Sequence, residues 1–133
     1  MDDVAARILR DYRRIAVVGI SDRPDRDSHR VAAYLQGAGY TVIAVNPNVA
    51  HVLGGPCWPS LDEAPGPIEV VDVFRRSELV PPVVDAALRI GARAVWMQDG
   101  VVHEAAAAKA RDAGLLVVMD RCMMRDHARG IGR

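Results

Sequence analysis

The sequence predicts an α/β protein with a three-layer, doubly wound, Rossmann-like fold, whose parallel five-stranded sheet has the strand order 3-2-1-4-5. Short apolar runs rich in β-branched residues, without polar alternation, are typical of strands buried on both faces of a parallel sheet. Amphipathic helical patterns alternate with these runs and favour right-handed crossovers. Because 133 residues is the usual size of one domain, residues 1–133 are expected to form a single domain.

The expected strands follow one another along the chain at intervals that leave room for a crossover. Each is about five residues long, as buried strands of parallel sheets commonly are. They span residues 15–18, 41–45, 70–74, 94–97 and 115–119.

Helices are expected between the strands and at both ends of the chain. In the internal segments, apolar residues recur at i, i+3, i+4 and i+7, and a glycine follows to close the helix. Serines placed before two of these segments suit the N-cap position. The helices are 31–38 with Ser28 as N-cap, 80–88 with Ser77 as N-cap, the alanine-rich 102–113, and the flanking segments 4–12 and 121–128.

Composition excludes several classes of protein. Seventeen basic and seventeen acidic residues give no net charge, which argues against a nucleic-acid partner held by clustered cations. No apolar run reaches the length of roughly eighteen residues that a membrane helix needs, and the N-terminus does not have the pattern of a signal peptide. Two cysteines do not make a disulfide framework. We expect a cytoplasmic protein with a small-molecule ligand, no membrane contact and no protein partner that the sequence identifies.

The segment after the first expected strand carries the strongest signal for a ligand site. Ligands of such folds bind outside the carboxyl ends of the strands. Gly19 ends that strand, and a polar loop leads to a helix start near Ser28, where the positive end of a helix attracts anions. The loop is not a G-x-G-x-x-G fingerprint, since Ser21 stands at its second glycine position. The next strand ends in Asn46 rather than in the acid typical of NAD sites.

Six short motifs, taken together and in order, resemble those of the small stand-alone CoA-binding domain proteins. These proteins are relatives of the CoA-binding domain of the succinyl-CoA synthetase alpha subunit. The resemblance extends over residues 13–127. The motifs lie at residues 18–21, 28–31, 45–47, 73–76, 96–100 and 118–122.

The resemblance implies a coenzyme A site at the carboxyl edge of the sheet. It places the loop Gly19, Ile20 and Ser21 at the pyrophosphate, near the helix start with Ser28. The basic residue that the family often carries as Lys corresponds here to Arg26 or Arg30, and the sequence leaves this choice open. The nucleotide and pantetheine path would be lined by Asn46, Pro47, Phe74 and Arg75, and its far wall by Met97, Gln98 and Gly100.

No catalytic or metal-binding constellation accompanies these motifs. The four histidines lack metal-ligand spacing, and neither cysteine has a base or an electropositive setting in the sequence. The favoured function is therefore binding of coenzyme A or an acyl-CoA without catalysis. The alternative is a small nucleotide-dependent enzyme that uses NAD(P) or acts on a CoA thioester.

Two kinds of group could bind the phosphates of such a ligand. One is the set of backbone N–H groups around Gly19 and the helix start, and the other is a group of arginines. We expect the backbone groups to contribute more than any single arginine, so that Gly19→Val would block the approach of the phosphate. The arginines are Arg23, Arg26, Arg30, Arg75 and Arg76.

Overall fold

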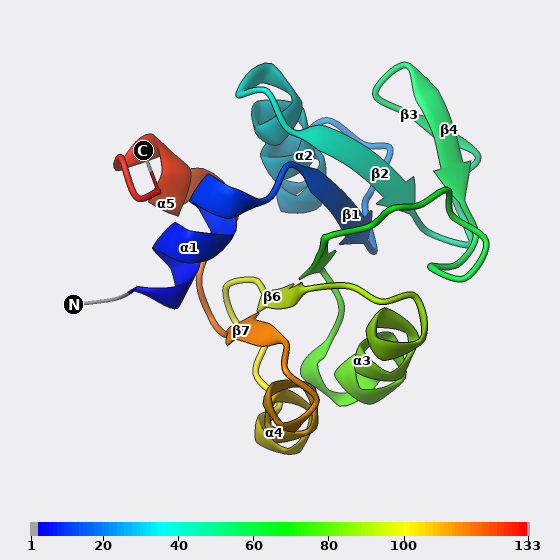
Figure 1. The fold of residues 1–133 in the computed structure, drawn as a ribbon. Helices are drawn as coiled ribbons and strands as arrows, with labels where there is room; N and C mark the ends of the chain where they lie inside the picture. Colours follow the sequence, from blue (N-terminus) through cyan, green and yellow to red (C-terminus); the bar gives the residue numbers. More distant parts are fainter. Residues whose placement is uncertain (1–2, 133) are drawn as a thin grey trace.

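A computed structural model describes residues 3–132 and shows one central sheet with helices on both faces (Figure 1). The helices are α1 (Val4–Asp11), α2 (Asp27–Gly37), α3 (Val80–Arg89), α4 (Glu104–Asp112) and α5 (Met123–Ala128), with a 3-10 turn, η1 (Ser77–Leu79), before α3. The strands are β1 (Arg14–Val18), β2 (Thr41–Val45), β3 (His51–Val52), β4 (Gly55–Trp58), β5 (Val70–Val73), β6 (Ala94–Met97) and β7 (Leu116–Val118).

The sheet confirms the predicted fold class but corrects its topology. Seven strands lie in the order β3-β4-β2-β1-β5-β6-β7, and all neighbours are parallel except β3 and β4. The predictions of five strands, of a wholly parallel sheet and of the order 3-2-1-4-5 are therefore wrong. The third expected strand, β5, pairs with β1 and not with β2, as the register Val17↔Asp72 shows.

A hairpin that the sequence analysis missed explains the different order. Leu53 and Gly54 have φ angles of 53° and 77°, as a two-residue hairpin turn requires, and they join β3 to β4. β4 then pairs with β2 at the position predicted for the third strand, with Ala44 opposite Cys57. The outer edge of β2 is thus already paired, and β5 lies on the other side of β1.

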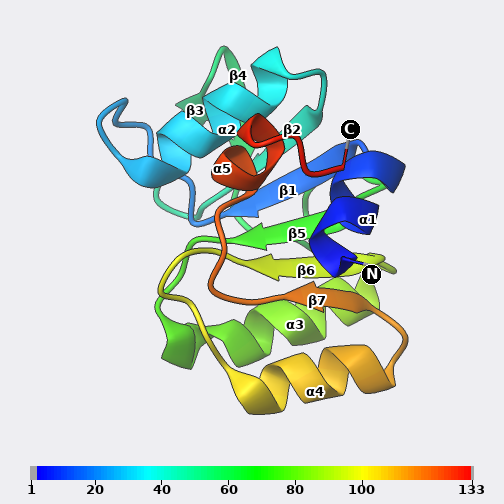
Figure 2. The same ribbon diagram turned by 90° about the vertical axis from the view of Figure 1, so that its left-hand side faces the viewer.

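The helices form two layers around the sheet. α3 and α4 cover one face, and α1, α2 and α5 cover the other, so the three-layer prediction is confirmed (Figure 2). Strand residues alternate between the two cores. On β5, Val71 and Val73 pack in the core under α3 and α4, and Val70 packs in the opposite core. Asp72 faces the same side as Val70 and is fully buried.

Two predicted helix caps are wrong. The N-cap of α2 is Arg26, so Ser28 is the second residue of the helix. Ser77 opens η1, and Leu79 precedes α3. The first turn of α3 contains Pro81 and Pro82, which have no N–H groups that a cap would have to satisfy. The remaining expected helices are present within a few residues of their predicted bounds.

Gly19 is required by the packing of the protein itself. Its φ angle is 89°, and a Cβ atom at this position would lie 2.1 Å from the carbonyl oxygen of Phe74. Gly19 N–H donates to the Val45 carbonyl (2.9 Å), and Phe74 N–H donates to the Val18 carbonyl (2.8 Å). A side chain at residue 19 would therefore collide with the backbone after β5. This corrects our reason for expecting Gly19→Val to block a phosphate.

None of the helices within residues 3–132 combines the length and the apolar character that crossing a membrane requires.

We predict that Gly19→Ala destabilises the protein far more than Gly39→Ala. Gly39 also has a positive φ, of 100°, but has nothing within 4 Å of its Cβ position. Gly39→Ala should lower the free energy of unfolding by about 1–2 kcal/mol, and Gly19→Ala by more than about 3 kcal/mol. Denaturant titration measures both. Equal losses would show that the end of β5 can move away from β1.

Candidate functional site

A hollow of about 590 Å³, called here the edge hollow, lies at the carboxyl ends of β1, β5 and β6 beside the start of α2. The structure thus brings together residues from three separate chain segments, those that follow β1, β5 and β6. Seven of the predicted residues line this hollow: Gly19, Ser21, Arg26, Ser28, Phe74, Arg75 and Gln98.

The loop between β1 and α2 is held by its own serines. Ser21 N–H donates to Ser28 Oγ (2.9 Å), and Arg23 N–H donates to Ser21 Oγ (3.0 Å). The first i→i−4 bond of α2 runs from Arg30 N–H to the Arg26 carbonyl. The N–H groups of the preceding helical residues therefore have no helical acceptor. The positive end of α2 faces the edge hollow and suits an anion.

Most of the charged side chains that line the edge hollow already have an ion-pair partner, either in the hollow or beside it. Four arginines and three aspartates line it. Arg23 lies 3.7 Å from Asp25, and Arg76 lies 3.4 Å from Glu78 outside the hollow. Within residues 3–132, Arg26 and Arg75 have no ion-pair partner. These two guanidinium groups are thus available to an anionic ligand.

Arg30, the alternative to Arg26 in the sequence analysis, is engaged elsewhere. Its guanidinium binds the carboxylate of Asp27 and donates to the Asp25 carbonyl (2.6 Å). It lines a neighbouring cavity rather than the edge hollow. The geometry therefore favours Arg26 as the residue that would contact a phosphate.

The side chains of three other predicted residues are either buried or hydrogen-bonded within the protein. The Ile20 and Met97 side chains are completely buried, so only their main-chain atoms could face a ligand. Asn46 Nδ2 donates to the Ile20 carbonyl (2.8 Å), and its Oδ1 accepts from Asn48 N–H (2.9 Å). Asn46 thus braces the loop after β1. Contact of these residues with a ligand stays a prediction.

Pro47 and Gly100 lie beside the edge hollow rather than on it. Pro47 lines a separate hollow of about 360 Å³, over the ends of β1 and β2 and beside α3, which shares Arg75 with the edge hollow. Gly100 N–H donates to Asp120 Oδ1 (2.7 Å) and so ties the loop after β6 to the loop after β7. Both remain predicted ligand contacts.

A second cavity of about 550 Å³, the α2–α5 cavity, adjoins the edge hollow. The two share Asp27, Phe74, Gln98 and Asp99. This cavity was not predicted from the sequence, because its walls come from helices more than eighty residues apart, at Val31 and Met124. Sequence spacing gives no signal for such a contact.

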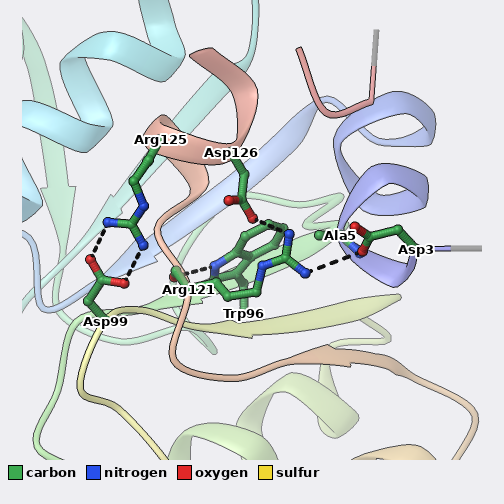
Figure 3. Close-up of polar contacts among 7 residues, drawn as sticks. All are labelled: Asp3, Ala5, Trp96, Asp99, Arg121, Arg125 and Asp126. Carbon is green, nitrogen blue, oxygen red and sulfur yellow. Dashed lines mark hydrogen bonds and ion pairs between the residues drawn. The ribbon is translucent and has the colours of Figure 1, made fainter. Parts of the chain in front are cut away.

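Polar contacts fix α5 beside β6 and thereby shape the α2–α5 cavity (Figure 3). Trp96 Nε1 donates to the Arg121 carbonyl (2.7 Å), and Arg121 Nη2 lies 2.9 Å from Asp126 Oδ2. Arg125 makes two hydrogen bonds with Asp99, of 2.7 and 2.8 Å. These bonds hold the pKa of the Asp99 carboxyl below its usual value. The Arg125–Asp99 pair therefore links α5 to the loop after β6.

Asp72 is a buried acid that the sequence analysis did not single out. Gln98 Nε2 donates to its Oδ1 (2.6 Å), and its Oδ2 has no hydrogen-bond partner among the described residues. Burial raises the pKa of Asp72 to about 7, against the opposing effect of the Gln98 bond. The signal in the sequence is a lone acid inside an apolar strand.

The fold and the edge hollow define the class of this protein: a Rossmann-like α/β domain whose anion-attracting crevice lies at the carboxyl ends of its strands. A family model described as "CoA binding domain" matches residues 13–128. The chain belongs to this CoA-binding domain family, so the resemblance seen in the sequence is confirmed.

Similar proteins extend this assignment. YneT of Bacillus subtilis (strain 168) is 47% identical over 121 residues, which cover 91% of this chain and 90% of YneT. A solved structure of a Pyrococcus horikoshii OT3 protein is 44% identical, with a TM-score of 0.91, and covers 94% of this chain and 88% of that one. An ADP-forming acetate–CoA ligase of Archaeoglobus fulgidus is 31% identical over 71 residues, 53% of this chain but 10% of the ligase.

We predict that Asp72 makes stability depend on pH. The pKa of Asp72 is higher in the folded than in the unfolded protein. The stabilisation that protonated Asp72 adds to the free energy of unfolding is therefore complete below about pH 4, and it is lost between about pH 4 and pH 7. In this window the free energy of unfolding should fall by up to about 1.4 kcal/mol per pH unit. Asp72→Asn should flatten this slope, measured by denaturant titration at several pH values. The exposed-site variant Asp112→Asn should keep it, and a parental slope in Asp72→Asn would contradict the prediction.

Proposed function

We propose that the protein binds coenzyme A or an acyl-CoA along the carboxyl edge of its sheet, without catalysis. The observation that carries this proposal is the combination, in one hollow, of the start of α2 and two arginines without ion-pair partners, Arg26 and Arg75. Coenzyme A carries a pyrophosphate and a ribose phosphate, so such a ligand needs several anion contacts at once.

The hollows lie in an order that suits the parts of this ligand. The pyrophosphate would lie at the N–H groups of α2, within reach of Arg26. The hollow with Pro47 adjoins the edge hollow at Arg75 and would take the nucleoside. On the other side, Phe74 and Gln98 lead toward the α2–α5 cavity and would line the pantetheine arm.

The lining of the edge hollow supports binding rather than turnover. It contains no histidine and no cysteine. Its serine hydroxyls have structural partners, since Ser28 Oγ accepts from Ser21 N–H and Ser21 Oγ accepts from Arg23 N–H. A nucleophile would need an adjacent base, and these contacts provide none.

Native mass spectrometry of freshly purified protein tests the proposal. We expect a bound mass equal to coenzyme A or an acyl-CoA, whereas a nicotinamide dinucleotide would contradict it. Incubation with acetyl-CoA or succinyl-CoA, with and without ATP, should release no thiol above the buffer rate. Thiol release that persists through further purification would overturn the non-catalytic part.

We predict that Arg26→Ala and Arg75→Ala each weaken coenzyme A binding about five- to tenfold, because each removes a charge-assisted hydrogen bond. Arg23→Ala should change affinity less than about twofold, since Arg23 is exposed and already pairs with Asp25. Calorimetric titration at low and high salt measures all three. An Arg23 effect as large as the other two would contradict this assignment of the phosphate contacts.

A further inference from the structure

We propose that the α2–α5 cavity binds the acyl group of an acyl-CoA, and that this group is apolar and uncharged. The inference rests on the proposed function, because it takes coenzyme A to lie in the edge hollow. It goes further by naming the class of ligand: a thioester of an apolar acid rather than free coenzyme A.

Gln98 stands where the edge hollow meets the α2–α5 cavity. It lines both and is only 3% exposed. Its Nε2 donates to Asp72, while its Oε1 has no partner among the described residues. Because Oε1 is not among the buried side-chain atoms without a partner, it remains accessible at this junction, where it can accept a hydrogen bond from a donor on a ligand. The amide N–H nearest the sulfur of the pantetheine arm is such a donor.

This hydrogen bond would direct the thioester into the α2–α5 cavity. In coenzyme A, that amide is separated from the sulfur by a short ethyl link. With the N–H at Gln98, the sulfur and the acyl group extend away from the edge hollow. Phe74 and Asp99, which also line both spaces, form the passage between them. The pyrophosphate would stay at α2.

The walls of the cavity suit an uncharged group. Val31, Tyr34 and Met124 supply apolar surface. The two arginines that line it are already neutralised, since Arg30 pairs with Asp27 and Arg125 pairs with Asp99. A dicarboxylic acyl group such as succinyl would find no free cation among these walls, whereas an aliphatic chain would bury its methylenes.

Calorimetric titration with coenzyme A, acetyl-CoA and butyryl-CoA tests the inference. Affinity should rise about fourfold for each methylene buried, and succinyl-CoA should bind more weakly than butyryl-CoA. Ala128→Phe, at the exposed end of α5 on the cavity wall, should bring the ratio of butyryl-CoA to coenzyme A affinity close to one. The matched variant Ala108→Phe, exposed on α4 and outside the cavity, should leave the ratio unchanged.

Cys122 provides a covalent test of position. This free cysteine lines the cavity and is 7% exposed. With bromoacetyl-CoA as the probe, the thiolate sulfur of Cys122 would displace bromide from the methylene carbon and form a C–S bond, and the thiol proton would pass to the buffer. Peptide mass spectrometry should find labelling at Cys122 that excess butyryl-CoA suppresses. Cys122→Ser should abolish labelling, and Cys57→Ser should retain it.

The outcomes separate the two proposals. If coenzyme A does not bind the parent protein, the proposed function fails. If coenzyme A binds, but butyryl-CoA binds no more tightly and bromoacetyl-CoA leaves Cys122 unlabelled, the acyl group lies elsewhere and only this inference is overturned. Labelling of Cys122 by bromoacetamide at the same rate as by bromoacetyl-CoA would also overturn it.

Discussion

The close approach of two strand ends, at Gly19 and Phe74, is the constraint on which the site depends. Because the Phe74 carbonyl occupies the space of a residue-19 side chain, the chain leaves β1 directly beside the end of β5. The loop after β1 then turns across the sheet edge to the start of α2, where Ser21 and Ser28 hold it. This arrangement brings Arg75 and the N–H groups of α2 to one hollow.

Polar groups buried beneath the hollow are less favourable for stability than apolar ones would be. Asp72 lies fully buried in the central strand with one carboxylate oxygen unpartnered, and burial raises its pKa to about 7. Local rules of stability are commonly broken at functional sites. Here the buried carboxyl of Asp72 accepts a hydrogen bond from Gln98 and fixes the Gln98 amide at the junction of two cavities. An aliphatic residue at position 72 could not do this.

The C-terminal part of the chain completes the site from a distance. The helix α5 spans only Met123–Ala128, too short to be stable alone, and it depends on tertiary contacts. The Trp96 bond to the Arg121 carbonyl and the Arg125–Asp99 pair supply them. The same contacts that stabilise the helix therefore form one wall of the α2–α5 cavity, so the stability of α5 and the shape of the cavity are linked.

The sequence by itself determined the five main parallel strands, the alternation of helices, the family and seven of the residues that line the edge hollow, because buried strands and loop glycines leave local patterns. Tertiary structure decided the rest. The strand order depended on a two-residue hairpin turn at Leu53 and Gly54, which placed β4 on the outer edge of β2. The choice between Arg26 and Arg30 depended on side-chain contacts, because Arg30 pairs with Asp27 and Arg26 has no ion-pair partner among the described residues. The α2–α5 cavity arose where two helices distant in sequence meet, and periodicity along a chain carries no information about such meetings.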